Sequence, residues 1–93
     1  MGTSVSASAR IDSVLDKLFL RWNGLDAIAA IWDQYEPLDR EVFHLEWSGI
    51  TGSLMAEIEK QESELNAAQK QRWQELQELA NAKQPMLRRM LAS

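Results

Sequence analysis

Apolar residues recur every three or four positions along the first third of the chain. They are Ile11, Leu15, Leu18, Trp22, Leu25, Ala29 and Trp32. Alternating steps of four and three mark one face of an α-helix. The phase continues through Asn23-Gly24, although such a pair usually marks a turn. We therefore predict a single helix over residues 9–35 with a weak point at Gly24, and two helices that meet there as the alternative.

A second apolar stripe follows Pro37, which disfavours helical geometry at Glu36 and suits the first turn of a helix. Its members are Phe43, Trp47, Ile50, Leu54, Ile58, Gln61, Leu65, Ala68, Arg72, Leu76 and Leu79, of which two are polar. The mean step of about 3.6 residues is the period of a straight α-helix. An unbroken helix over residues 38–83 would be about 70 Å long, against about 40 Å for residues 9–35. These lengths do not match, so either the long helix breaks near Gly49 and Gly52 or it overhangs and needs a partner. The excess length and the weak stripe lead us to expect an oligomer.

Gly49 and Gly52 interrupt the second stripe. Each glycine inside a helix costs about 1 kcal/mol relative to alanine, and the nearby Ser48 or Thr51 can cap a new helix. We therefore predict a break that gives helices 38–48 and 52–83, with Trp47 packed inside the corner.

The expected fold is all-α, either an antiparallel helical hairpin or a three-helix bundle with a long C-terminal helix. One helical domain would cover residues 9–84. The small and polar residues 1–8 predict a disordered leader. Pro85 is expected to end the last helix and to leave residues 85–93 as a short amphipathic tail.

The composition excludes several classes of protein. A chain of 93 residues with a net charge of −4 is one small acidic domain, and its charge argues against non-specific nucleic-acid binding. It has no cysteine, which excludes disulfides and thiolate chemistry and fits a cytoplasmic location. No apolar run approaches the roughly 20 residues that span a bilayer.

The sequence offers little catalytic chemistry. It has one histidine, no cysteine and no serine in a nucleophile motif, so we expect no enzymatic activity and no cofactor. Glu41 and His44 have the E-x-x-H spacing of ferritin-like di-iron bundles, which also need glutamates from neighbouring helices. No metal is expected, and a ferritin-like metal protein that uses this pair stays as an alternative.

The tripeptide Trp47-Ser48-Gly49 lies near the midpoint of the chain. It resembles the W-x-G motif of the WXG100 family of small secreted helical hairpins. The resemblance implies that the tripeptide lies in the turn between two helices and that the protein forms a dimer. The chain departs from the family pattern at Pro37, which interrupts the first long helix, and after Glu78, where no acidic residue follows.

The C-terminal third carries the residues that we assign to partner binding. Trp73 has four glutamines close to it in the sequence, and the segment after Pro85 combines apolar and basic residues. Tryptophan and arginine are common in binding hot spots. The predicted partner-binding residues are Trp73, Leu76, Met86, Leu87, Arg88, Arg89, Met90 and Leu91. The expected function is non-enzymatic protein binding, as an adaptor, a secretion-type chaperone or a regulatory or inhibitory subunit, with a second copy or another protein as partner.

Overall fold

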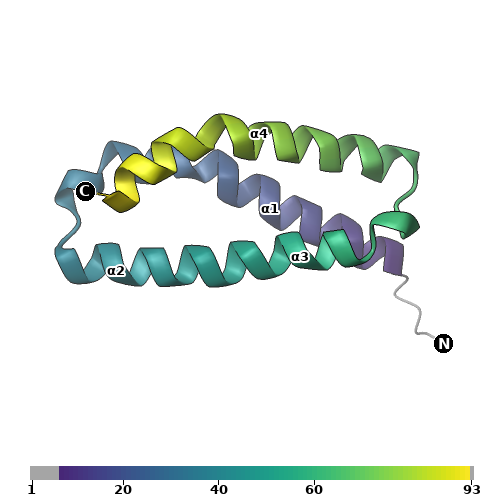
Figure 1. Cartoon of the computed structure of the whole chain (residues 1–93), viewed down its shortest axis with the longest axis horizontal. Helices are drawn as coiled ribbons and strands as arrows, with labels where there is room; N and C mark the ends of the chain where they lie inside the picture. The colour runs from purple at the N-terminus through teal and green to yellow at the C-terminus, as the bar shows by residue number, and fades with distance from the viewer. Residues whose placement is uncertain (1–6, 93) are drawn as a thin grey trace.

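The protein consists of three helical rods, and a computed structural model describes residues 7–92 (Figure 1). Its elements in chain order are α1 (Ala7–Ala30), η2 (Trp32–Gln34), α2 (Pro37–Glu46), η3 (Trp47–Thr51), α3 (Gly52–Lys60), η4 (Glu62–Glu64) and α4 (Ala67–Ala92). The elements η2 and η4 are 3₁₀ turns, and η3 is a π-helical turn that joins α2 and α3 into one rod. The predicted all-α fold is confirmed, as a three-helix bundle rather than a hairpin.

Helix α1 packs against both other rods and runs parallel to α4. Three polar pairs fix the register between α1 and α4. They are Gln69–Asp12 at 3.1 Å, Arg72–Asp16 at 2.6 Å and Lys83–Asp26 at 2.5 Å, and their members lie 57, 56 and 57 residues apart in the sequence. Because this separation is nearly constant, the two helices advance side by side in the same direction.

The three rods are closely matched in length. Helix α1 has 24 residues and α4 has 26, and the rod formed by residues 37–60 lies alongside them (Figure 1). The bundle closes within one chain. The excess helix length from which we expected an oligomer is therefore not present.

The apolar stripe of α1 forms the centre of the core, as its period predicts. Leu15, Leu18 and Leu25 are completely buried, and Trp22 exposes only 3% of its surface. Full burial of such side chains contributes about 1.5–3 kcal/mol each. Helix α1 continues through Gly24 without a positive φ and ends at Ala30. The extension to residue 35 was wrong, because residues 32–34 form the 3₁₀ turn that leads to the extended Glu36 before Pro37.

The break predicted at Gly49 and Gly52 is wrong. The chain passes through both glycines as the π-helical turn η3, and Gly52 has helical angles of φ −60° and ψ −42°. Packing of the buried Trp47 side chain stabilises the turn. Trp47 is 6% exposed, and its ring lies 4.9 Å from the ring of Trp22 and 5.7 Å from that of Phe43. Aromatic pairs of this kind contribute about 0.5–1.5 kcal/mol each beyond the area that they bury, which offsets the glycine cost.

The second rod ends instead at Gln61, so the predicted helix 52–83 is also wrong. Leu65 is extended, and Asn66 caps α4. The Asn66 side chain accepts a hydrogen bond from the Gln69 backbone N–H at 2.8 Å, and the Gln69 side chain accepts one from the Asn66 N–H at 3.0 Å. This reciprocal capping box satisfies N–H groups that a helix start otherwise leaves unpaired. The chain can therefore stop one helix and begin another within six residues.

Pro85 lies inside α4, so the prediction of a separate tail at residues 85–93 is also wrong. A proline inside a helix costs about 3 kcal/mol and bends it. The C-terminal part of α4 curves toward the connection between α1 and α2 (Figure 1). There Leu87 and Met90 expose only 6% and 5% of their surface. Their burial, worth about 1.5–3 kcal/mol each, compensates for the proline.

At the other end, residues 1–6 of the predicted leader lie outside the described residues. Ala7 and Ser8 belong to the first turn of α1 rather than to a leader. The Ser8 carbonyl and hydroxyl oxygens each accept a hydrogen bond from the Gln69 side chain at 3.1 Å. Within residues 7–92, no helix combines the length and the apolar character needed to cross a membrane.

Candidate protein-binding surface

The structure places most of the predicted partner-binding residues in the core. Trp73 is 4% exposed, Leu76 is completely buried, and Leu87 and Met90 expose 6% and 5%. These four side chains are not accessible to a partner in this fold, so their assignment as an interaction surface was wrong. Met86 and Leu91 are half-buried against the same core, and Arg88 and Arg89 are exposed on α4.

The error at Trp73 has a geometric cause. The stretch between α3 and α4 resets the helical phase, so the buried face of α4 follows Gln69, Trp73, Leu76 and Ala80. The other three glutamines near Trp73 in the sequence point away from this face and are exposed. Residues that are neighbours in sequence thus lie on different sides of the helix.

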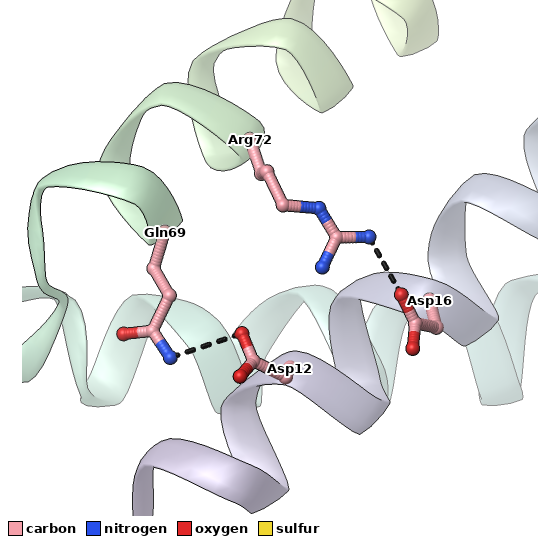
Figure 2. A network of polar contacts seen from close by, with 4 residues as sticks. All are labelled: Asp12, Asp16, Gln69 and Arg72. Carbon is pink, nitrogen blue, oxygen red and sulfur yellow. Dashed lines mark hydrogen bonds and ion pairs between the residues drawn. The ribbon is translucent and has the colours of Figure 1, made fainter.

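The buried Gln69 belongs to a polar contact between α1 and α4. Its side-chain amide donates to Asp12 at 3.1 Å, one turn from the ion pair of Arg72 with Asp16 at 2.6 Å (Figure 2). Gln69 is 2% exposed, and its side-chain amide has partners on both of its polar atoms. Because these groups are mutually satisfied, they hold the two helices in register and do not form a binding site.

Glu41 and His44 are exposed on α2. Among residues 7–92, no group of three or more histidine, aspartate or glutamate side chains lies close enough to hold a metal ion. The α1 helix presents Asp12, Asp16 and Asp26 toward α4 rather than toward this pair. The geometry therefore gives no support to the ferritin-like alternative.

The W-x-G tripeptide lies in the middle of the second rod, inside the π-helical turn. The WXG100 resemblance implies a turn between two helices at this position, and the structure contradicts that expectation. The two connections of the bundle lie at residues 31–36 and 61–66 instead.

A different part of the molecule exposes large apolar side chains. Six of them within residues 7–92 are exposed, and all six fall between residues 20 and 50. They are Leu20 (74%), Ile31 (42%), Leu38 (69%), Val42 (44%), Leu45 (68%) and Ile50 (47%). We call this set the exposed apolar surface. Exposed large apolar side chains that gather in one part of a folded domain are a feature of interaction sites.

Three members of this surface follow one face of α2. Leu38, Val42 and Leu45 are spaced four and three residues apart, so they form a helical stripe. Phe43 and Trp47 point to the opposite side, where they pack in the aromatic cluster with Trp22 and Trp32. The rod is thus apolar on its inner face and on part of its outer face.

A groove runs between α1 and α2 beside this stripe. It consists of two hollows with volumes of about 280 Å³ and 510 Å³, which share Phe43 and Glu46. The first is bordered on the α1 side by Leu20, Arg21, Gly24 and Ile28. The second is bordered by Ile31, Val42 and Asp39, among others. We call the pair the α1–α2 groove.

The segment that forms the α2 side of the groove is acidic. Residues 31–50 carry five carboxylates and one arginine, a net charge of −4. The arginine, Arg40, donates to the Trp32 carbonyl oxygen at 3.1 Å and lies 5.4 Å above its ring, so it is held at the connection between the helices. Three ion pairs join described residues, and none of them includes Asp39 or Glu46.

A further hollow of about 450 Å³ lies between the π-helical turn and α4. Its lining combines the polar Ser48, Gln77, Asn81 and Gln84 with apolar side chains that include Met55, Leu87 and Leu91. It contains no member of the exposed apolar surface. The α1–α2 groove is therefore the stronger candidate for binding a protein.

Comparison with protein-family models, with curated proteins and with solved structures finds no match to this chain. The function must accordingly be inferred from the surface itself.

Proposed function

We propose that this protein is a non-enzymatic helical module that binds another protein through its exposed apolar surface. The observation that carries the proposal is the clustering of all six exposed large apolar side chains of residues 7–92 between residues 20 and 50. Burying them in an interface would contribute roughly 25 cal/mol for each Å² of apolar area removed from water. An adaptor, a secretion-type chaperone and a regulatory or inhibitory subunit all use such a surface.

The partner in this proposal is a different protein or a second copy of the chain. Only the exposed apolar surface now supports the proposal of a homodimer, since the matched helix lengths do not require one. We also propose a cytoplasmic location, which the cysteine-free sequence supports.

The proposal is tested with the triple variant Leu38→Gln, Val42→Gln and Leu45→Gln. Glutamine is a good helix former, and these positions are exposed, so the fold is retained. Tagged wild-type chain is purified from its native cells beside the variant, and the bound proteins are compared. We expect a protein that is bound by the wild type and lost from the variant.

A control pair, Glu78→Gln with Ala82→Gln, changes exposed positions of α4 and should leave binding intact. The pair Arg88→Gln with Arg89→Gln tests the remaining part of the C-terminal prediction. Sedimentation at several concentrations shows whether the partner is a second copy. Retention of the same bound proteins by the triple variant, with unchanged sedimentation, would refute the proposal.

A further inference from the structure

The charge and shape of the α1–α2 groove together define a class of partner. We propose that this groove binds one amphipathic α-helix of another protein, with lysine or arginine on both sides of its apolar stripe. This inference rests on the proposed function and specifies the partner and the place where it binds.

The dimensions of the groove suit a helix. Its border from Leu20 on α1 to Ile31, just after α1, advances by 11 residues, or about 16 Å at 1.5 Å per residue. A bound helix places apolar anchors at i, i+4 and i+7 over such a length. The half-buried Ile28 and Phe43 form the apolar floor that these anchors would contact.

Gly24 keeps the middle of the groove open. Apart from the backbone of its own helix and its two chain neighbours, no heavy atom lies within 4 Å of the position that a Cβ would take there. The absence of a side chain lets another backbone come close to α1. Since φ is negative at Gly24, the local fold does not require glycine.

The charges on the rim select a basic partner. Asp39 and Glu46 line the groove, and neither takes part in the three ion pairs of the described chain. Arg21 also lines it, but its side chain donates to the Thr51 hydroxyl at 3.0 Å and lies over the Trp47 ring. The lining thus carries two carboxylates against one guanidinium that already has partners in the chain. Opposite charge on a partner steers association and suppresses incorrect partners. An isologous contact between two copies would set this acidic region against itself, so electrostatics favours a different protein over a second copy.

A synthetic peptide serves as the probe. It has about 18 residues of leucine, alanine and lysine, with leucines on one face of the helix and lysines on both sides of them. A matched peptide carries glutamate at each lysine position. Binding to the full chain is measured by calorimetry, and backbone amide chemical shifts locate the peptide. We expect the lysine peptide to shift amides along the α1–α2 groove and the glutamate peptide not to bind.

Gly24→Arg is the blocking variant. The open space at this position accommodates a side chain, and arginine is a better helix former than glycine, so the melting temperature should not fall. The added bulk and positive charge should weaken binding of the lysine peptide about tenfold or more. Ala82→Arg makes the same change of charge at an exposed site on α4 and should remain within about twofold of wild type.

The rim charges are tested by the double variant Asp39→Asn with Glu46→Gln. Each exposed charge pair contributes modestly, so we expect about fivefold weaker binding and a smaller dependence on salt. The control variant, Glu62→Gln with Glu78→Gln, removes two exposed carboxylates outside the groove and should have little effect.

Several results would overturn the inference. They are equal binding by wild type and Gly24→Arg, equal binding of the glutamate peptide, and shifts centred on the hollow between the π-helical turn and α4. Self-association that Gly24→Arg abolishes would also overturn it, because the occupant would then be a second copy. If the lysine peptide fails while Leu38, Val42 and Leu45 still govern binding of a native partner, this inference falls and the proposed function stands.

Discussion

Replacing Gln69 with alanine should destabilise the folded chain by about 2–4 kcal/mol, although Gln69 is only one polar residue at the start of a helix. The Gln69 side chain accepts from the Asn66 N–H at 3.0 Å and contacts three acceptors on α1, each at 3.1 Å. Those acceptors are the carbonyl and hydroxyl oxygens of Ser8 and the carboxylate of Asp12 (Figure 2 shows the last).

The magnitude follows from counting these bonds. Loss of the capping interaction costs about 1 kcal/mol. The amide has two hydrogens, so it makes at most two full bonds to α1, each worth about 0.5–1.5 kcal/mol net. The sum is about 2–4 kcal/mol. In a domain of this size each kcal/mol lowers the melting temperature by about 4–8 °C, so we expect a fall of roughly 10 °C or more.

A second variant, Gln69→Glu, separates the hydrogen bonds from the volume of the side chain. It keeps the size but puts a carboxyl group among acceptors and beside Asp12. Burial there raises the pKa of the introduced carboxyl above its unfolded value of about 4.3. The folded state then binds the proton more tightly than the unfolded state, so the deficit relative to wild type grows as the pH rises from about 4 to about 7.

Both variants are measured by thermal and urea unfolding followed by circular dichroism. Gln74→Ala and Gln74→Glu are the matched controls, because Gln74 is exposed on the same helix. A loss for Gln69→Ala within about 0.5 kcal/mol of Gln74→Ala, or a pH-independent deficit for Gln69→Glu, would refute the reasoning.

Three further predictions concern the corrected elements. Gly49→Ala with Gly52→Ala should raise the stability by about 0.5–1 kcal/mol per site, since both glycines are helical and a Cβ meets nothing within 4 Å; a lowered melting temperature would contradict this. Truncation after Gln84 removes the buried Leu87 and Met90 and should lower the melting temperature by at least roughly 10 °C. An unchanged melting temperature would show that the residues after Pro85 do not contribute to the stability of the bundle. Trp73→Ala should lower the free energy of unfolding by about 3–5 kcal/mol. Trp73→Phe should lower it much less, because the indole N–H of Trp73 has no hydrogen-bond partner. Equal urea midpoints for the two variants would contradict this prediction.

The sequence predicted the fold class and the core of α1 because the apolar period there is uniform. The second stripe could not be followed in the same way. A π-helical turn contains one more residue than an α-turn, so Thr51 takes the inner position that a period of 3.6 assigns to Ile50. Thr51 is 5% exposed and Ile50 is 47% exposed. The Arg21 side chain donates to the Thr51 hydroxyl at 3.0 Å, a contact over 30 residues that local periodicity does not contain.

The connection between α3 and α4 has a sequence signal that we overlooked because we followed the apolar pattern. Asn66 and Gln69 have the spacing of a capping box, which marks a helix start in sequence. Carrying one phase from Phe43 onward instead placed Ala68 and Arg72 on the apolar face. The structure leaves Ala68 exposed and Arg72 partly exposed and buries Gln69 and Trp73. A local capping signal should therefore take precedence over a long average period where the apolar stripe becomes polar.

The sequence of α2 does not decide which of its two apolar faces packs against α1, and the candidate binding surface is the face that does not. Its ten residues carry two apolar sets, Phe43 with the adjoining Trp47 on one side and Leu38, Val42 and Leu45 on the other. Only one set can face α1. The aromatic set does so because it packs edge to face with Trp22 and Trp32, and aromatic rings bury about 150–250 Å² each. A helix with apolar residues on both sides is normally enclosed by protein, and no element among residues 7–92 covers the outer stripe. The same packing preference that assembles the bundle thus leaves on its outside the surface for which we propose a partner.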